Sequence, residues 1–450
     1  MKTTKLFLLV LCPFCMFLTC NNQKSDRIIT TLRNKVVPLV TITSKKDIPD
    51  DPKVAALLKI IQNDSLLVET AIGIELRGAL SQSFDKKSYS FECRNQENKG
   101  KKVSFLGMSA DEDWVLHGPM NDRTLIRNPL AYILSNQIGK YAAKSQFVEL
   151  EINGDYKGLY LLMEKLKRDS LRINIKKLKK EDISPEKITG GYILKIDKTA
   201  GSSDDWADYN ESNSFHSNYD EKGRLSQKSK INYLYEYPKA KNINDNQKAY
   251  IQNYVNEFEK IMAAKTFKDT AVGYVKYIDV QSFIDYFILT EFTQNHDGYR
   301  ISTYLQKDEN GKLGMGPIWD CDIAFGPGQA YCSEMENDAW VFKYNQYCGG
   351  DTWLAPFWWE KLVSDPIFKT KVVARWQSLR KSVLSDQNIE KSINEMAKYL
   401  QDNKLVNRNY ERWSDSGGEN AKERHQKHID ALKVWSKKHA SWLDREMLKL

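Results

Sequence analysis

The sequence predicts an α+β protein of two lobes: an antiparallel, sheet-rich N-terminal lobe over residues 51–165 and a helical C-terminal lobe over residues 166–450. The first observation is length, because 450 residues exceed the roughly 250–300 at which a single hydrophobic core stops growing. The second is order: extended segments come first along the chain, and apolar stripes at helical spacing follow them. A hydrophobic fraction of 41% and a charged fraction of 28% agree with a folded globular body.

The first 20 residues have the features of an export signal peptide. Lys2 and Lys5 precede an apolar run at residues 6–11, and polar residues follow Cys20 directly. The run is too short to span a membrane. The residues before Cys20 resemble a loose version of the lipobox of bacterial lipoproteins, which implies that Cys20 becomes the lipidated first residue of the mature protein. The alternative is a plain secretory peptide that is cleaved elsewhere.

Residues 21–50 are polar or Lys-rich and lack sustained periodicity. Such a segment suits a tether between a membrane anchor and a folded domain, so we expect the fold to begin near Pro52. With the signal peptide, this organisation predicts a protein that is lipid-anchored outside the cytoplasm, in a periplasm or at the cell surface.

Four cysteines lie beyond the signal peptide, at Cys93, Cys321, Cys332 and Cys348. An exported protein can form disulfides, and Cys332 and Cys348 share a loop rich in Gly, Asn and Tyr, so this is the pair that we expect to be joined. A zinc site is not expected, because the sequence has no Cys-x-x-Cys pair and no His beside these positions.

The N-terminal lobe is predicted from strand and hairpin signals. Residues 68–77 and 88–94 are extended, with a turn-like segment between them. Residues 147–152 and 159–163 flank the sequence Asn-Gly-Asp-Tyr-Lys-Gly, which is a strong hairpin signal. Residues 125–138 carry helical apolar spacing and end at a glycine.

The C-terminal lobe is predicted from helical periodicity. After a strand at residues 192–196, the polar segment 199–230 reads as a long loop. Apolar stripes then predict helices around residues 250–262 and 283–292, and amphipathic helices run from about residue 376 to the end.

Composition and missing motifs exclude several functions. The net charge of +8 is spread over short Lys clusters with interleaved acids, which is typical of a solvated basic face, so no nucleic-acid partner is expected. The sequence has no Walker-type phosphate loop, Gly-x-Gly-x-x-Gly, His-Glu-x-x-His or Gly-x-Ser-x-Gly motif. These absences disfavour a P-loop nucleotidase, a zinc protease and a serine hydrolase.

Two carboxylates flank a predicted hairpin in the C-terminal lobe. Asp297 follows the second helix, residues 301–317 read as a hairpin, and Asp320 comes directly after it. A hairpin returns the chain on itself, so the two acids can lie side by side as a base and a magnesium ligand. Simple capping of turns is the alternative. It is weakened because Asp320 and Asp322 stand in a mostly apolar strand end, where uncompensated carboxylates are costly.

Phosphoryl transfer also requires a cation beside the phosphates. Lys86 and Lys87 follow a Gly/Ser-containing turn and lead into a predicted strand, and either could meet the α- and β-phosphates of a nucleotide. The alternative is a solvated lysine on a strand surface.

The order of these motifs resembles the spore-coat protein H (CotH) family of atypical secretory kinases. The resemblance covers roughly residues 72–380. The matching segments are Arg77–Ser81 with Lys86–Phe91, Asp122 with Arg127 and Asn128, residues 148–164, Gly191–Leu194, Asp285–Phe287, Asn295–Asp297, Trp319–Gly326, and Arg375 with Trp376 and Leu379 with Arg380.

The resemblance implies a divergent, two-lobed protein-kinase-like fold. It also implies phosphorylation of Ser or Thr on exported proteins, with ATP and magnesium as cofactors. Asp297 would be the catalytic base and Asp320 the magnesium ligand, with Asp322 as a second ligand. Lys87 would bind phosphates.

Three further positions follow from the resemblance. Glu164, at the end of a hairpin strand, would lie near the adenine, or would be an exposed strand-end charge. Many family members carry Asn five residues after the catalytic Asp to hold a second metal ion, and here Ser302 occupies that position. Asp122 and Arg127 would form an internal ion pair that positions a helix.

Two other functions stay open. A catalytically weak, kinase-like surface lipoprotein could bind proteins or glycans, which agrees with the 11 Trp and 23 Tyr residues of the chain. The same fold could also perform nucleotidyl transfer or phosphorylate a glycan. We expect a monomer that acts on an exported protein substrate and contacts the membrane through its lipid.

Overall fold

The computed structural model of the chain describes residues 36–78, 80–199, 208–326, 332, 338–413 and 420–450. The described residues belong to one compact unit that begins at Val36. The predicted signal peptide, with Cys20, and the first part of the predicted tether lie outside the described residues.

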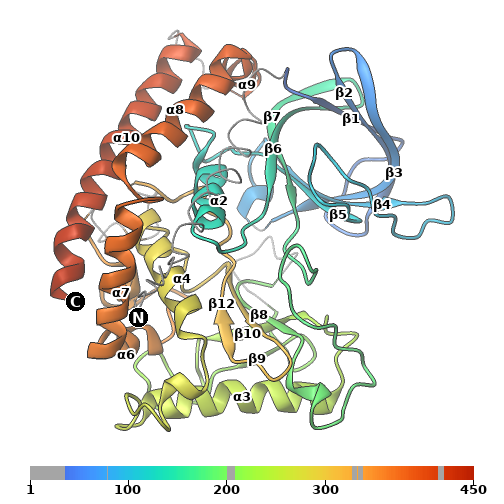
Figure 1. Ribbon diagram of the computed structural model, residues 1–450. Helices are drawn as coiled ribbons and strands as arrows, with labels where there is room; N and C mark the ends of the chain where they lie inside the picture. Colours follow the sequence, from blue (N-terminus) through green and yellow to red (C-terminus); the bar gives the residue numbers. More distant parts are fainter. Residues whose placement is uncertain (1–35, 79, 200–207, 327–331, 333–337, 414–419) are drawn as a thin grey trace, which may run out of the picture. The chain divides into compact units, whose positions relative to one another are not determined.

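Seven strands form a closed barrel in the order β1-β2-β3-β4-β5-β7-β6 (Figure 1). Their bounds are β1 Leu39–Ser44, β2 Val54–Gln62, β3 Ser65–Arg77, β4 Ser88–Arg94, β5 Asp113–His117, β6 Ser145–Ile152 and β7 Asp155–Glu164. Neighbouring strands pair antiparallel, except that β1 and β6 close the barrel in parallel. Alternate side chains such as Val40, Ile42 and Leu58 fill the interior, as the two-residue period of a strand requires.

Strand β1 corrects the predicted extent of the tether. Residues 21–50 were predicted to be a tether, but Leu39–Ser44 pairs with both β2 and β6 and is part of the barrel. The strand is only six residues long, and its two buried apolar residues, Val40 and Ile42, are too few to stand out as periodicity beside Lys45 and Lys46. The folded part of the chain therefore begins before Pro52.

A second sheet has the strand order β12-β11-β8-β10-β9. Its strands are β8 Tyr192–Ile196, β9 Ser214–His216, β10 Asn232–Tyr237, β11 Thr303–Lys307 and β12 Leu313–Met315. The predicted hairpin is confirmed as β11 and β12, in which Leu305 lies opposite Met315. The strand expected at residues 192–196 and the hairpin thus belong to one sheet in the mainly helical lobe, because strands separated by a long polar insertion come together around β8.

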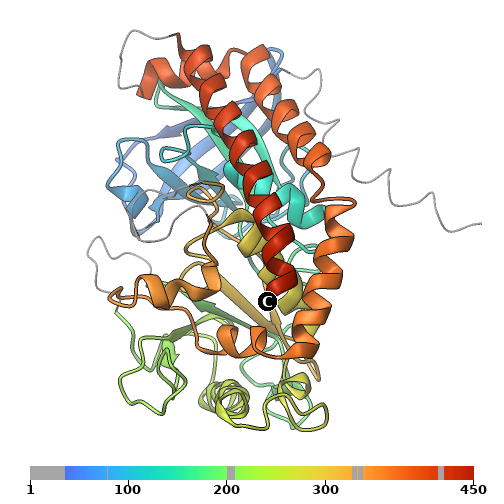
Figure 2. The ribbon, with the colours of Figure 1, turned by 90° about the vertical axis from the view of Figure 1, so that its left-hand side faces the viewer.

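The remaining described residues after β7 are mainly helical. The helices are α3 Asp245–Ala263, α4 Val280–Thr293, α5 Tyr344–Tyr347, α6 Trp358–Val363, α7 Pro366–Arg380, α8 Asp386–Asp402, α9 Leu405–Trp413 and α10 Ala421–Glu446, and α2 Arg127–Gln137 precedes them between β5 and β6. Short 3₁₀ turns lie at Leu80–Gln82, Lys187–Thr189, Tyr274–Lys276, Val341–Lys343 and Met447–Lys449. Helix α10 runs along α8 and α9, as Figure 2 shows, and α9 packs on β7.

Helix α4 is buried on all sides. Its sequence, Val-Gln-Ser-Phe-Ile-Asp-Tyr-Phe-Ile-Leu-Thr-Glu-Phe-Thr, is apolar around most of its circumference, which is typical of a core helix. Asp279 caps its first turn by accepting hydrogen bonds from the backbone of Gln281 and Ser282. The carboxylate of Asp285 forms ion pairs with Arg375 of α7 at 2.8 Å and with Lys140 at 3.2 Å. The helix is therefore a fixed base for the loop that follows it.

The fold class is mixed α+β, with a sheet-rich first part and most helices in the C-terminal half, as predicted, whereas the closure of the first strands into a barrel was not predicted. The predicted domain boundary at residue 165 falls directly after β7, the last strand of the barrel. Among the described helices, none combines the length and the apolarity needed to cross a bilayer.

Candidate active site

The loop after α4 carries Asp297. The helix stops at Thr293 because Gln294 adopts a left-handed conformation with φ 45°, which turns the chain out of the helix. The side chain of Asn295 then accepts a hydrogen bond from the backbone of Asp297 at 3.3 Å. Asp297 is thus presented by a short loop that is anchored to a buried helix.

Arg300 is the direct partner of Asp297. Its Nη2 lies 2.7 Å from Oδ1 of Asp297, and the two side chains are 2% and 16% exposed. Desolvation by the surrounding protein raises the pKa of Asp297, and the charge of Arg300 opposes that shift. The carboxylate of Asp197 raises the same pKa further, and Lys198 lowers it. The pKa of Asp297 is therefore set first by burial and then by the opposing charges of Arg300 and Asp197.

Hairpin β11–β12 returns the chain so that Asp320 interacts electrostatically with Asp297. Desolvation raises the pKa of Asp320 to about 6, although part of the residue stays open to solvent. Arg77 opposes this shift, whereas Asp297 and Asp197 add to it. For Asp322, desolvation comes first and the charge of Asp320 second, and together they raise its pKa well above the ordinary value. The acids on the two sides of the hairpin therefore form one negatively charged cluster.

Helix α2 braces the loop that carries Asp320. The backbone N–H of Asp320 donates to the hydroxyl of Tyr132 at 3.2 Å, and that of Cys321 donates to Oδ1 of Asn128 at 2.7 Å. Asp320 itself has φ 58°, a left-handed conformation that costs a non-glycine residue energy unless its surroundings enforce it. These hydrogen bonds from a buried helix supply that enforcement.

The predicted pair of Asp122 and Arg127 lies at the start of α2. Nε of Arg127 is 3.4 Å from Oδ1 of Asp122, whose other oxygen accepts the backbone N–H of Arg127 at 2.8 Å. Nη1 of Arg127 donates to the carbonyl of Ala324 at 2.6 Å. The ion pair therefore links the start of the helix to the loop of Asp320.

Carboxylate oxygens are the ligands that Mg²⁺ prefers, so the acid cluster has a suitable donor set. Among the described residues, no ion pair involves the carboxylates of Asp320 or Asp322, and their pKa values are raised first by desolvation and then by the neighbouring acids. Their oxygens do not gather into a closed group of three ligands. The cluster therefore fits a cation that takes its other ligands from elsewhere, as a nucleotide-bound magnesium ion does.

A tighter acidic group lies at Asp111, Glu112 and Asp113, whose ligand atoms are within 4.8 Å of one another. Nζ of Lys167 lies 2.9, 3.4 and 2.8 Å from these three carboxylates, and Nη1 of Arg172 is 2.9 Å from Asp111. The position that a metal ion would take is filled by an ammonium group. This cluster ties the start of β5 to the segment after β7 and is structural.

The barrel cation that faces the acids is Arg77 rather than a lysine. Arg77 ends β3, its guanidinium is 5.5 Å from the ring centre of Trp319, and it interacts electrostatically with Asp320. Nζ of Lys87 instead donates to the carbonyl of Gln82 at 2.6 Å. Arg77 belongs to the Arg-Gly-x-x-Ser segment of the sequence, and its place at a strand end before a glycine is the signal that could have identified it.

Lys86, the other predicted phosphate ligand, is buried away from the acids. Its Nζ donates to Oδ1 of Asn409 at 2.7 Å and lies 5.0 Å from the ring centre of Tyr160. Burial lowers the pKa of this lysine well below its ordinary value. Lys86 therefore joins the barrel to α9.

Glu164 and Ser302 have clear partners in the structure. Glu164 is fully buried, and its carboxylate accepts hydrogen bonds from the hydroxyl of Tyr141 and the backbone of Lys144, both at 3.1 Å, with Nε of Arg172 at 3.7 Å. It is not an exposed strand-end charge. The side chain of Ser302 interacts with Asp320 and lowers the pKa of that carboxyl group.

Several site residues were missed from the sequence: Arg77, Asp197, Lys198 and Arg300. Asp197 directly follows β8, so its place beside Asp297 depends on the pairing of β8 with β11 across more than 100 residues. A Lys-Ile-Asp-Lys sequence at a strand end was the available signal.

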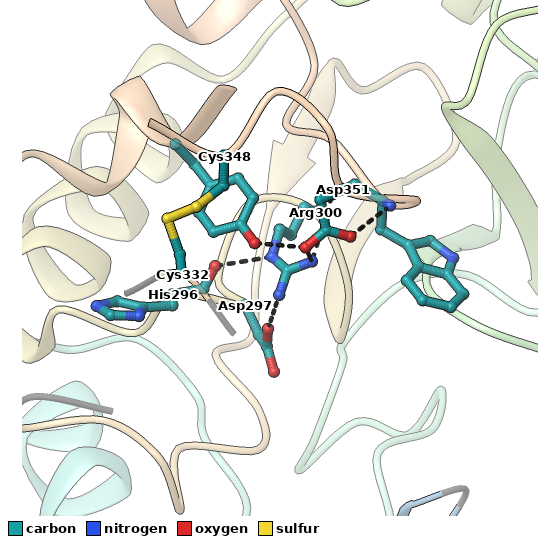
Figure 3. Close-up of a disulfide and its surroundings, with 8 residues drawn as sticks. His296, Asp297, Arg300, Cys332, Cys348 and Asp351 are labelled. Carbon is teal, nitrogen blue, oxygen red and sulfur yellow. Dashed lines mark hydrogen bonds and ion pairs between the residues drawn. A yellow bond between two sulfur atoms is a disulfide. The ribbon is translucent and has the colours of Figure 1, made fainter. Parts of the chain in front are cut away.

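The structure joins Cys332 to Cys348 by a disulfide, which is the pair expected from the sequence (Figure 3). Cys93 and Cys321 are buried free thiols. Asp351, three residues after Cys348, lies 3.1 Å from Nη1 of Arg300, so the disulfide is close along the chain to the partner of Asp297.

A cavity of about 450 Å³ lies elsewhere, between the ends of β5 and β7 and strand β10. Its lining includes Lys165, Arg168 and Tyr237 and contains none of the acids of the hairpin. The candidate active site is therefore distinct from this cavity.

Fold and site together define an α+β protein in which carboxylates on the two sides of a β-hairpin form a cluster, and Arg77 of the barrel faces this cluster. Residues 74–443 match the family described as CotH kinase protein, and the chain belongs to that family. It is also similar to the inner spore coat protein H of Bacillus subtilis (strain 168), with 24% identity over 284 residues. That match covers 63% of this chain and 65% of the relative, so the chain spans slightly less than two thirds of the length of the curated relative that it matches.

Proposed function

We propose that the protein is an ATP- and magnesium-dependent kinase that phosphorylates Ser or Thr on exported proteins. Membership of the CotH kinase family supports a kinase-like protein. The single observation that carries the proposal is the carboxylate cluster, in which Asp297 and Asp320 interact across hairpin β11–β12 and face Arg77 of the barrel. A divergent, two-lobed kinase-like arrangement, with the barrel as one lobe and the helical region as the other, is part of this proposal.

Each side chain has a role in this proposal. Asp297 holds the acceptor hydroxyl and takes its proton, because it is the acid with a fixed cationic partner in Arg300. Asp320 and Asp322 hold magnesium, since they combine oxygen donors with mutual electrostatic repulsion that a cation would relieve. Arg77 neutralises charge on the phosphates in place of Lys87. When bound, Mg²⁺·ATP supplies the phosphoryl group and an electrophilic phosphorus.

Incubation of the mature chain, residues 20–450, with labelled ATP and magnesium tests the proposal. We expect incorporation of label into the protein or into an added Ser/Thr-containing acceptor, and its loss in Asp297→Ala and Asp320→Ala. Glu257→Ala, an exposed residue of α3, is the matched control for loss of a carboxylate. Equal labelling in all variants, or no nucleotide binding in any of them, would sink the kinase assignment.

The second candidate function is a binding module without turnover. One observation favours it: Ser302 stands where many family members have a metal-binding Asn, and its hydroxyl is a weaker ligand. Calorimetry with Mg²⁺·ATP, read together with the labelling assay, separates the two functions. A kinase binds the nucleotide and transfers the label, whereas a binding module either does not bind the nucleotide or binds it without transferring the label.

We also propose that Cys20 is lipidated and holds the protein at a membrane outside the cytoplasm. The motif around this residue supports the proposal. Cell fractionation of wild type and Cys20→Ser is the test. Release of the variant into the soluble fraction is expected, and equal membrane retention of both forms would contradict the anchor.

A further inference from the structure

Each of the three guanidinium nitrogens of Arg300 has a hydrogen-bond partner, and these partners come from two separate segments. Nη2 contacts Asp297 of its own loop, and Nε donates to the carbonyl of His296 at 3.1 Å. Nη1 lies 3.1 Å from Oδ2 of Asp351 and 3.3 Å from the carbonyl of Trp353. The guanidinium group is planar and rigid, so the direction of each of its hydrogen bonds is fixed relative to the others. The contacts to the second segment therefore determine the position of Nη2 beside Asp297.

The second segment, residues 344–353, is here named the Asp351 segment. Tyr344 begins it, with its ring centre 4.3 Å from the guanidinium carbon of Arg300 and its hydroxyl 2.5 Å from Oδ2 of Asp351. Figure 3 shows Arg300 between Asp297 and Asp351. Because Arg300 is 2% exposed, water cannot replace these partners.

The Asp351 segment also supports the other charges beside Asp297. The ring centre of Trp353 lies 4.3 Å from Nζ of Lys198, and its indole N–H donates to the hydroxyl of Tyr209 at 3.2 Å. That hydroxyl donates to the carbonyl of Asp197 at 2.7 Å. Lys198 and Asp197 both act electrostatically on Asp297. Three neighbours of the catalytic candidate therefore depend on one short segment.

The disulfide fixes this segment. Cys348 lies inside it, and its partner Cys332 is 6% exposed. The backbone of Asp351 donates to the carbonyl of Cys348 at 3.0 Å, and the backbone of Cys348 donates to the carbonyl of Tyr344 at 2.8 Å. The cross-link and the acid that holds Arg300 thus belong to one hydrogen-bonded turn.

We propose that Arg300 is a positioning residue for Asp297 and that the Cys332–Cys348 disulfide makes this positioning dependent on redox state. The inference rests on the proposed kinase function and adds a means of regulation to it. A dithiol reductant breaks the S–S bond with two electrons and two protons, leaves two protein thiols and is itself oxidised to a disulfide. The reduced segment gains freedom, Asp351 no longer fixes Arg300, and Asp297 loses its orientation.

Steady-state kinetics with Mg²⁺·ATP test the positioning role of Arg300. We expect Arg300→Met to lower kcat by about 100-fold, the effect of a misplacement near 1 Å, with KM for ATP changed by less than about threefold. Arg300→Lys keeps a charge and restores part of kcat, and the isosteric Asp351→Asn lowers kcat without removing Arg300. Arg380→Met, which breaks a half-buried ion pair with Asp444, is the matched control and keeps kcat. An unchanged kcat in folded Arg300→Met overturns the positioning role.

Reduction tests the redox part. Dithiothreitol is expected to lower kcat of the wild type by about tenfold, and reoxidation restores it, since loss of alignment is reversible. The Cys332→Ala/Cys348→Ala variant has the lower kcat in both states. Cys93 and Cys321 are already thiols, so an equal response of this variant to the reductant contradicts the proposal.

Hydrogen exchange separates failure of this inference from failure of the kinase proposal, because it needs no turnover. Reduction is expected to raise exchange of the backbone amides of residues 296–301 and 344–353 by at least about tenfold, with no change in the barrel strands. If exchange rises in a protein that never turns over ATP, the redox-dependent positioning of Asp297 is supported and the kinase proposal is rejected. If reduction leaves exchange at residues 296–301 unchanged, the redox-dependent positioning of Asp297 is rejected, whether or not the protein has kinase activity.

Discussion

The side chain of Ser302 interacts with the carboxylate of Asp320 and lowers its pKa, so the residue that stands in the place of the family's asparagine acts on the candidate metal ligand. Ser302 has φ 50°, a left-handed conformation that Asn adopts more readily than most residues. The backbone at this position therefore already suits an asparagine side chain.

Ser302→Asn is expected to strengthen metal binding. The amide oxygen adds a ligand of the kind that Mg²⁺ accepts, and the positive φ does not oppose the change. The Mg²⁺ concentration for half-maximal activity should fall by about tenfold, within the range seen for groups that surround metal ligands. Ser302→Ala removes the interaction with Asp320 and should raise the Mg²⁺ concentration for half-maximal activity. A magnesium titration at saturating ATP measures both, and the same midpoint in all three proteins contradicts the role given to this position.

Arg77→Met is expected to weaken Mg²⁺·ATP binding by about 10- to 100-fold, which corresponds to about 1.5–3 kcal/mol for a hydrogen bond to a charged group. The reason is that Arg77, not Lys87, interacts electrostatically with Asp320. Lys87→Met is the matched control, because its ammonium is bonded to the carbonyl of Gln82. Titration calorimetry compares them. A larger loss in Lys87→Met would restore the lysine as the phosphate ligand.

Glu259 of α3 is expected to make stability depend on pH. It is 1% exposed and accepts hydrogen bonds from Ser217 and Tyr233, both at 2.7 Å. Desolvation raises its pKa from 4.5 to about 7. The folded state therefore binds the proton more tightly than the unfolded state does, and this stabilisation is complete below pH 4.5 and lost as pH rises to about 7.

Comparison of wild type with Glu259→Gln isolates this effect. The free energy of unfolding of the wild type relative to the variant should fall by about 3 kcal/mol between pH 4.5 and 7 and then stay constant. Urea unfolding at several pH values measures the difference, in which the titration of all other groups cancels. A difference that does not vary with pH shows that the pKa of Glu259 is the same in the folded and the unfolded protein.

Asp285→Ala is expected to destabilise the fold by about 3–5 kcal/mol, because it leaves a buried region with uncompensated cations. The carboxylate of Asp285 is 1% exposed and holds Arg375 and Lys140 against α4. Asp430→Ala removes a solvent-exposed pair with Lys433 and should cost less than about 1 kcal/mol. Chemical denaturation compares the two variants. Equal costs would mean that the ion pairs of Asp285 add little to the packing of α4.

Local patterns in the sequence predicted the elements that define the site. Hairpin β11–β12, helix α4 and helix α2 each follow from a turn signal or an apolar stripe within about 15 residues, and the hairpin alone brings Asp320 toward Asp297. The sequence therefore predicted the acid pair, and also the disulfide, from short-range information.

The rest of the site depends on pairings that no local pattern records. Strand β1 closes the barrel against β6, more than 100 residues away, and β8 meets β11 over a similar separation. Asp197 reaches the acids through the pairing of β8 with β11. Lys87 was predicted as the phosphate ligand because it follows a Gly/Ser turn and leads into a strand, and Arg77 was not considered, since the direction of a side chain at the end of β3 is fixed by the tertiary fold.

The contact between Lys86 and Asn409 bears on how the chain is made. A buried lysine beside the barrel finds its acceptor 323 residues later, on α9. During synthesis the barrel strands emerge long before that acceptor does, and a buried amine without a hydrogen-bond partner is costly. The region around Lys86 therefore reaches its full stability only after α9 has left the ribosome, when most of the chain has been made.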